Sequence, residues 1–193
     1  MSSKLIVIVG VGALGSHLAM LLRNHEGTLR LVDFDRVEQK NVLSQFHGRP
    51  SVGKSKVQAL QGVMQLLFGV RAEVIPHRLT SDNVQQLLGD AELVVDCLDN
   101  GASRRVVQRF VRANSVPCLH GALDANGSFG RAVWDEDFEI DDEAAEGAAT
   151  CENGEHLPFI AITSGYLAQA AQVFVKNGAK ISFHSHPGGA DRV

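Results

Sequence analysis

Up to Gly121, short apolar runs alternate with longer segments in which apolar residues recur every three or four positions. The short runs predict buried strands, and the longer segments predict helices with one apolar face. The predicted strands are residues 5–9, 29–32, 71–75, 93–97 and 117–121. The predicted helices are residues 16–22, 54–68, 81–88 and 103–113. This alternation indicates an α/β fold with a doubly wound, mainly parallel sheet.

The pattern changes after Gly121. Residues 125–134 predict a hairpin that turns at Asn126-Gly127, which would give the sheet an antiparallel extension. Residues 135–150 predict a mobile crossover loop, because their first part is acidic and carries few apolar side chains.

The last part of the chain predicts an apolar helix at residues 159–175. Residues 177–193 predict a tail that is either frayed or ends in a strand at residues 180–184. We see no internal repeat and no second domain, so we expect residues 1–193 to form one nucleotide-binding domain.

A glycine-rich turn joins the first predicted strand to the first predicted helix: Gly10-Val11-Gly12-Ala13-Leu14-Gly15. In such a turn the first glycine allows the bend, the second lets the backbone approach a phosphate, and the third lets helix and strand pack closely. The N–H groups at the start of the helix then face an anion. The next strand ends at Asp33, where Rossmann-like folds carry an acid for ribose hydroxyls. The turn therefore predicts a nucleotide site, although glycines kept for packing alone would look the same.

Composition narrows the classes of function. The formal net charge is −4 at pH 7, so we expect no nucleic-acid-binding surface. We find neither an apolar run of about eighteen residues nor a basic leader, so we expect no membrane span and a cytoplasmic protein. The three cysteines lack CxxC spacing, so no structural zinc is expected.

Further polar residues follow the glycine turn in order along the chain: Asp33, Asp35, Asn41, Lys56, Asp99, Asn100 and Arg104. A nucleoside triphosphate needs backbone donors, cationic side chains and a carboxylate that holds a metal ion. The glycine turn can provide the donors, Lys56 the cation, and Asp99 the carboxylate. Arg104 could orient Asp99 or hold its loop.

Simpler interpretations of these residues remain open. Lys54 and Lys56 could be solvated charges at a helix start. The segment Asp99-Asn100-Gly101 could be only a turn and a helix cap. Asp35 could be a turn former, and Arg104 a structural partner.

The ordered set resembles the ubiquitin-activating enzyme superfamily, in its ThiF/MoeB branch, from Leu5 to about Val175. The resemblance implies binding of ATP and Mg²⁺, with Asp33 on the ribose, Asn41 and Lys56 on the nucleotide, and Asp99 on the magnesium ion. It implies adenylation of the C-terminal carboxylate of a small ubiquitin-like or sulfur-carrier protein. It also implies a homodimer, which we expect to form through the apolar C-terminal helix.

Two positions qualify this resemblance. Cys151 follows the predicted crossover loop, as a cysteine does in the family, and is a candidate catalytic thiol for thioester or sulfur transfer; an inert thiol is equally compatible. Ser44 stands where the family usually carries an arginine, in the stretch Asn41-Val42-Leu43-Ser44-Gln45. Because serine carries no charge for a phosphate, a nucleotide-binding pseudoenzyme remains an alternative. An NAD-binding oxidoreductase is the other, since it would share the glycine turn and Asp33.

Overall fold

The computed structural model describes residues 4–140, 154 and 156–193. The strands are β1 (Leu5–Val9), β2 (Thr28–Val32), β3 (Glu73–Ile75), β4 (Leu93–Asp96), β5 (Cys118–Leu123), β6 (Gly130–Trp134), β7 (Phe183–His186) and β8 (Gly189–Arg192). The helices are α1 (Ala13–Leu21), α2 (Lys56–Phe68), α3 (Val84–Leu88), α4 (Gly101–Asn114) and α5 (Leu157–Asn177).

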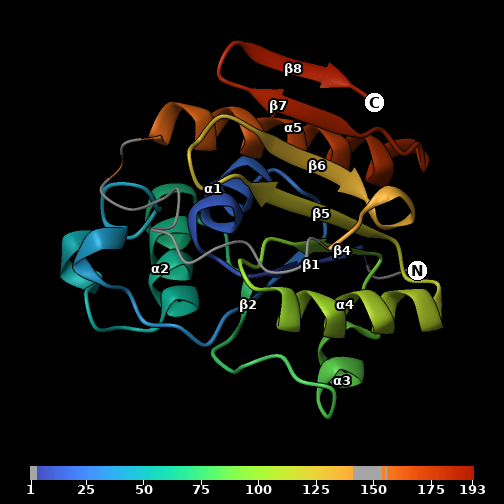
Figure 1. The fold of residues 1–193 in the computed structure, drawn as a ribbon. Helices are drawn as coiled ribbons and strands as arrows, with labels where there is room; N and C mark the ends of the chain where they lie inside the picture. The colour runs from blue at the N-terminus through green and yellow to red at the C-terminus, as the bar shows by residue number, and fades with distance from the viewer. Residues whose placement is uncertain (1–3, 141–153, 155) are drawn as a thin grey trace.

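All the described strands form one eight-stranded sheet in the order β3-β2-β1-β4-β5-β6-β7-β8. The pairings from β3 to β5 are parallel, and those from β5 to β8 are antiparallel. Figure 1 shows this sheet with α1 and α5 on one face and α3 and α4 on the other. The doubly wound, mainly parallel sheet with an antiparallel extension is therefore confirmed.

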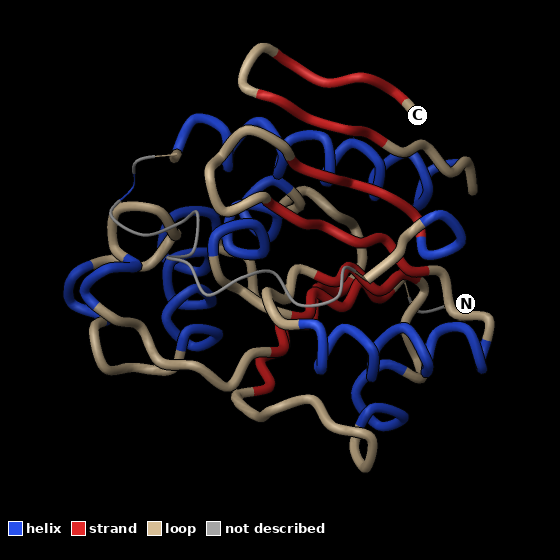
Figure 2. Tube along the Cα trace, viewed as in Figure 1, coloured by secondary structure: helices blue, strands red, loops and turns tan. Residues whose placement is uncertain are grey.

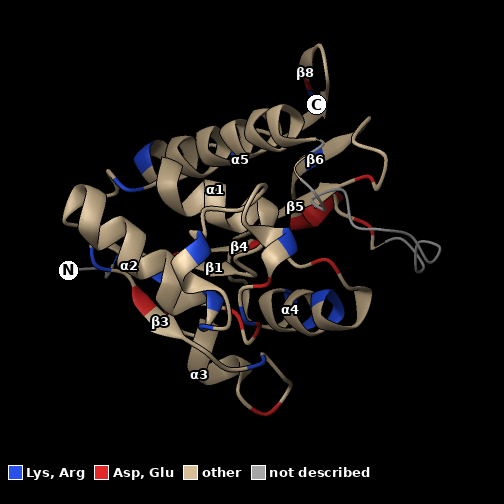
Figure 3. Ribbon diagram, turned by 90° about the vertical axis from the view of Figure 1, so that its left-hand side faces the viewer, with Lys and Arg blue, Asp and Glu red and all other residues tan. Residues whose placement is uncertain are grey.

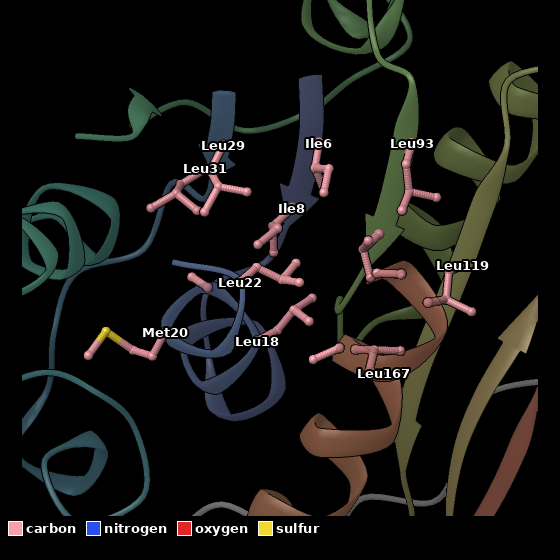
Figure 4. Close-up of a cluster of buried hydrophobic side chains, with 14 of the residues drawn as sticks. Ile6, Ile8, Leu18, Met20, Leu22, Leu29, Leu31, Leu93, Leu119 and Leu167 are labelled. Carbon is pink, nitrogen blue, oxygen red and sulfur yellow. The ribbon is translucent and has the colours of Figure 1, made fainter. Parts of the chain in front are cut away.

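Side chains alternate between the two faces along the central strands, as the pleat requires. Ile6 and Ile8 of β1 belong to a core with α1, α2 and α5, whereas Leu5, Val7 and Val9 belong to a core with α3 and α4. Figure 4 shows the first of these cores, in which Leu18 of α1 and Leu167 of α5 lie beneath the strands. Both faces of β1 are buried, which explains its uninterrupted apolar sequence.

The structure corrects several boundaries, which can be followed in Figure 2. Helix α1 begins at Ala13 rather than residue 16. The predicted hairpin is formed by β5 and β6, and Gly127 lies in the connection with φ of 69°. The tail is not frayed, because β7 and β8 form a hairpin at the edge of the sheet.

The predicted loop at residues 135–150 is wrong at its start. Residues Asp135–Asp137 form a 3-10 helix. Asp135 and Phe138 are buried, so the apolar and charged contacts of this segment outweigh its acidic composition. The remainder of the predicted loop, residues 141–150, lies outside the described residues.

The predicted apolar helix at residues 159–175 is present as α5, which extends from Leu157 to Asn177. By length and composition alone it passes the test for a membrane span, although 44% of its most apolar window is buried inside the protein. A helix in the core of a protein passes the same test. Its buried residues pack on α1 and on the sheet, as Figure 4 shows for Leu167.

Candidate functional site

The glycine turn lies at the carboxyl end of β1, between β2 and β4. Gly10 has φ of 86°, and a Cβ atom there would lie 2.8 Å from the Cys97 carbonyl oxygen. A Cβ atom on Gly15 would lie 1.9 Å from the Gly10 carbonyl oxygen, so both positions need glycine for packing. A Cβ atom on Gly12, by contrast, would meet only Nε2 of Gln45, at 4.0 Å. Gly12 therefore leaves open space that a side chain would fill, which suits a phosphate group.

Asp33 holds this turn in place. Its two carboxylate oxygens accept the N–H groups of Val11 and Asp35, each at 2.8 Å. The carbonyl of Val11 is also engaged, by the ring of His47 at 3.1 Å. Burial raises the pKa of Asp33, against the effect of nearby Lys56. A carboxylate oxygen can accept more than one hydrogen bond, so Asp33 retains capacity for a ribose hydroxyl.

Lys56 opens α2 and is not a solvated helix-start charge. Its side chain is 10% exposed, and its Nζ lies 3.0 Å from Oδ2 of Asp35. The backbone N–H of Lys56 also donates to the Asp35 carbonyl, at 2.9 Å. Lys56 is linked to the glycine turn through Asp35, whose N–H donates to Asp33, and Asp33 in turn accepts the N–H of Val11.

Asn41 and Ser44 lie in the segment that packs against α1. Asn41 is buried, and its Oδ1 accepts the N–H of Glu38 at 2.8 Å, so it closes a local turn. Ser44 is 1% exposed, and its Oγ has no hydrogen-bond partner among the described residues. Nδ1 of the buried His47 has none there either, and burial lowers the pKa of His47 to about 4. These buried polar atoms near the glycine turn are compatible with a polar ligand or with water.

The loop after β4 carries the candidate metal-binding residue. Asp99 is exposed, as a ligand for a metal ion must be before binding. Asn100 caps α4, since its Oδ1 accepts the N–H of Ser103 at 2.9 Å, and its Nδ2 lies 3.4 Å from Asp99 Oδ1. The cap considered in the sequence analysis is therefore present. Arg104 does not orient Asp99 directly; it bonds Asp96 at 2.9 Å and the Leu98 carbonyl, and so holds the loop.

A small cavity of about 30 Å³ lies where β1, β2 and β4 end, next to Asp33. The guanidinium of Arg78 covers the ring of Phe34 there, 3.8 Å from its centre. The lining residues include several that the sequence analysis did not select: Phe34, His77, Arg78, Leu79, Leu98 and Ser103. Their signal was their position, because Phe34, His77 and Leu98 each lie two residues past the end of a strand.

A second, open cavity of about 410 Å³ is lined by Gln39, Lys40, Val42, Leu43 and Arg49. It lies in the irregular segment between β2 and α2. Figure 3 shows that basic and acidic positions both occur around β1, β4 and α4. Positive charge near the site is therefore mixed with carboxylates rather than concentrated in one patch.

Two of the three cysteines, Cys97 and Cys118, lie among the described residues, and both are free thiols. Cys151 lies outside the described residues. Burial raises the pKa values of the Cys97 and Cys118 thiols, so neither is a reactive thiolate. Among residues 4–140, 154 and 156–193, no group of three or more metal-ligating side chains was found.

The sequence analysis missed a buried charged cluster behind the loop after β4. It joins Asp96, Arg104, His120, Asp135 and Arg112. Its members are spread over four elements and have no motif spacing. Only the fold brings them together.

Comparison with known proteins supports the family resemblance stated in the sequence analysis. A model of the ThiF family matches residues 1–181. The adenylyltransferase and sulfurtransferase UBA4 of Meyerozyma guilliermondii is 29% identical over 175 residues, which cover 86% of this chain and 41% of that protein. The sulfur carrier protein adenylyltransferase of Thermus thermophilus is 36% identical over 121 residues, which cover 61% of this chain and 45% of that protein. The chain thus spans less than half the length of these two relatives.

Among solved structures, Escherichia coli MccB with ATP matches 100% of this chain and 63% of its own, with a TM-score of 0.75. The identity is 13%, so this match speaks for the fold alone.

Proposed function

Because the chain belongs to the ThiF family, we propose that it uses ATP and Mg²⁺ to adenylate the C-terminal carboxylate of a small ubiquitin-like or sulfur-carrier protein. In this reaction a carboxylate oxygen bonds to the α-phosphorus of ATP, and the bond from that phosphorus to the bridging oxygen breaks. The products are an acyl-adenylate and pyrophosphate.

One observation carries this proposal most directly: a buried lysine, Lys56, is linked through Asp35 and Asp33 to an open glycine turn. Gly12 leaves space for a phosphate, and Lys56 brings a cation that is paired with Asp35. An oxidoreductase that binds NAD would need the turn and Asp33 but has no evident use for Lys56. Charge neutralisation on a triphosphate does need such a cation.

The other residues divide the remaining tasks. Asp33 would accept a ribose hydroxyl, and the small cavity beside it is lined in part by the apolar side chains of Val9, Leu79 and Leu98. The N–H groups at the start of α1 would face the phosphates. Asp99 would hold the magnesium ion, which supplies charge neutralisation for the leaving pyrophosphate when bound. Positioning and electrostatic stabilisation then account for catalysis, with no covalent step on the protein.

We further propose that the protein is cytoplasmic and forms a homodimer, as the family resemblance implies. The exposed large apolar side chains do not favour α5 as the interface. They favour the end of α2, where Leu66, Leu67 and Phe68 are 83%, 59% and 45% exposed. On α5 only Leu157, at 37%, stands among the exposed large apolar residues of the described chain.

The test is exchange of labelled pyrophosphate into ATP, in the presence of candidate carrier proteins. We expect exchange that requires both Mg²⁺ and a free carrier C-terminus. Asp99→Ala should abolish exchange, whereas Asp82→Ala, which removes an exposed carboxylate near α3, should leave it unchanged. Binding of ATP without exchange, with every carrier tried, would instead support a non-catalytic binding protein and agree with the loss of arginine at Ser44.

A further inference from the structure

The peptide group of Leu98, next to the candidate metal-binding Asp99, is held on both sides. Its N–H donates to Oδ1 of Asp96 at 2.9 Å, and its carbonyl accepts a hydrogen bond from Nη2 of Arg104. Because Asp99 follows directly, the place of its backbone depends on Asp96 and Arg104. Asp99 itself has no contact with either side chain among the contacts described above.

Asp96 and Arg104 form a buried pair. Nη1 of Arg104 lies 2.9 Å from Oδ2 of Asp96. The Arg104 side chain is 9% exposed, and the Asp96 side chain is 0% exposed. Nη2 of Arg104 also donates to the carbonyl of Gly121 on β5, at 2.7 Å. The loop after β4 is thereby tied to the neighbouring strand. Burial opposes ionisation of Asp96, but Arg104 and His120 hold its pKa below its usual range.

His120 on β5 lies between two carboxylates. Its Nδ1 is 2.8 Å from Oδ2 of Asp96, and its Nε2 is 3.1 Å from Oδ1 of Asp135. A neutral imidazole has one N–H and could donate to only one of them, whereas the other contact would join two lone pairs. With both carboxylates ionised, as their lowered pKa values indicate, the geometry requires an imidazolium that donates to both. The ring of Phe138 stacks on it with a centroid distance of 4.2 Å, which excludes water.

Asp135 is anchored in turn by Arg112 of α4. Nε of Arg112 donates to Oδ2 of Asp135 at 2.7 Å, and its Nη2 donates to the Asp135 carbonyl at 3.0 Å. A continuous line of charged contacts thus runs from Arg112 through Asp135, His120 and Asp96 to the backbone beside Asp99. Buried ion pairs of this kind often add little to stability compared with apolar residues of similar size. Stability alone is therefore a weak reason for this arrangement.

We propose that His120 and Asp135 are positioning residues for adenylation, which fix the Asp96–Arg104 pair and, through the Leu98 peptide, the place of the Asp99 carboxylate. They do not touch the nucleotide. This inference rests on the proposed function, because it assumes that Asp99 holds magnesium. Residues that orient a metal ligand typically change metal affinity by about 10-fold to 100-fold when they are altered.

The main test is Asp135→Asn, which keeps the size and an acceptor oxygen but removes the charge. The matched control is Glu136→Gln, since the next residue pairs with Lys180 at the surface and takes no part in the cluster. Calorimetry should show ATP binding without Mg²⁺ unchanged in both variants. In Asp135→Asn the Mg²⁺ concentration that gives half-maximal enhancement of ATP binding should rise about tenfold, and Glu136→Gln should match the wild type.

The outcomes separate the inference from the proposed function. Wild-type protein that binds ATP but shows no exchange would overturn adenylation, while the Mg²⁺ measurement would still judge the positioning role. A fall in melting temperature of Asp135→Asn with an unchanged Mg²⁺ requirement would show a purely structural cluster and overturn the inference.

Two further measurements cover a variant that does not fold. Arg112→Gln removes the outer cation, whose side chain is 52% exposed, so folding should survive and the Mg²⁺ requirement should shift in the same direction. Nitrogen-15 NMR of the histidine rings in wild-type protein at pH 8 should show both ring nitrogens of His120 protonated. A single protonated nitrogen, or an unchanged Mg²⁺ requirement in Arg112→Gln, would contradict the proposed arrangement.

Discussion

The ammonium group of Lys56 lies 3.0 Å from the carboxylate of Asp35, and the lysine is 10% exposed whereas the aspartate is 47% exposed. The pair is therefore unequal. A phosphate that takes over the lysine would release Asp35 into water, where its charge is readily solvated, rather than leave it buried and unpaired. Lys56 can therefore exchange its ion pair with Asp35 for an ion pair with an anion, without leaving a buried charge unpaired.

Lys56→Ala should consequently lower pyrophosphate exchange by about 100-fold or more, the usual effect of removing one stabilising group from a charged transition state. Its effect on the melting temperature should be small, since Asp35 remains hydrated. Lys54→Ala is the control, because Lys54 is exposed and lies two residues earlier, before the start of α2. Equal losses in the two variants would mean that only general surface charge matters.

Gly12 and Gly15 should respond differently to the same substitution. Gly15→Ala would place a Cβ atom 1.9 Å from the Gly10 carbonyl oxygen, so we expect a marked loss of melting temperature. Gly12→Ala meets only Gln45 Nε2 at 4.0 Å, so folding should survive better while ATP affinity falls by about tenfold or more. Thermal unfolding measures the melting temperatures of the two variants, and calorimetry measures their ATP affinities. Unaltered ATP affinity in a folded Gly12→Ala protein would argue against phosphate binding at this turn.

Cys151→Ala should leave pyrophosphate exchange intact, because adenylation as proposed needs no thiol. If a thioester or sulfur-transfer step follows, the variant should lose only that later product, which mass spectrometry of the protein–carrier adduct would detect. Loss of exchange itself would contradict the separation of the two steps.

Stability should fall as pH rises above neutrality because of His120. Burial alone would lower the pKa of this imidazole, but Cys118, Asp135 and Asp96 raise it from the ordinary 6.5 to about 11. A folded-state pKa above the unfolded one stabilises fully below about pH 6.5, and the contribution is lost as pH approaches 11. The charged and titratable groups around the ring are Asp96 on β4, Cys118 on β5, Asp135 after β6 and Arg104 on α4.

Urea denaturation between pH 6.5 and 10 measures this contribution. The midpoint for wild-type protein should decrease steadily with pH, and His120→Gln should be less stable at pH 6.5 with a much shallower decrease. His25→Gln is the control, because the His25 side chain is half-buried and bonds the Lys4 carbonyl, outside the charged cluster. Parallel slopes in wild type and His120→Gln would contradict a buried imidazolium.

Self-association should depend on α2 rather than α5. Leu66→Glu with Leu67→Glu should shift sedimentation at micromolar protein from dimer to monomer, because both side chains are exposed at the end of that helix. Leu157→Glu, at the start of α5, should leave the dimer intact. Wild-type protein that sediments only as a monomer would remove the homodimer from the proposal.

The sequence was most informative for candidate site residues that come after the end of a strand. The glycine turn, Asp33 and Asp99 could be selected because each directly follows an apolar run, and the family resemblance ordered the rest. The predicted start of α1 was three residues too late, because the glycine turn leads straight into the helix at Ala13.

What the sequence did not reveal depends on contacts between distant segments. Asp135 begins an acidic segment whose composition is typical of a loop. Only its contacts with His120 and Arg112 make it part of the interior. The eight histidines gave no reason to select His120. For the tail the sequence offered a strand at residues 180–184 only as an alternative to fraying, because these residues carry little alternation; β7 gains its order from pairing with β6 and β8.

The position of β4 beside β1 also bears on how the protein is made. The ribosome delivers the glycine turn before β4, and β1 gains its second neighbour only when residues Leu93–Asp96 have emerged and paired with it. Such long-range pairing is slow compared with the local pairing of β5 with β6 or β7 with β8. A nascent chain that stops before Leu93 would therefore contain the glycine turn but lack the loop after β4, which is the other half of the proposed nucleotide site. The edge of β1 that later pairs with β4 would be uncovered, and such an edge is prone to aggregation until synthesis proceeds.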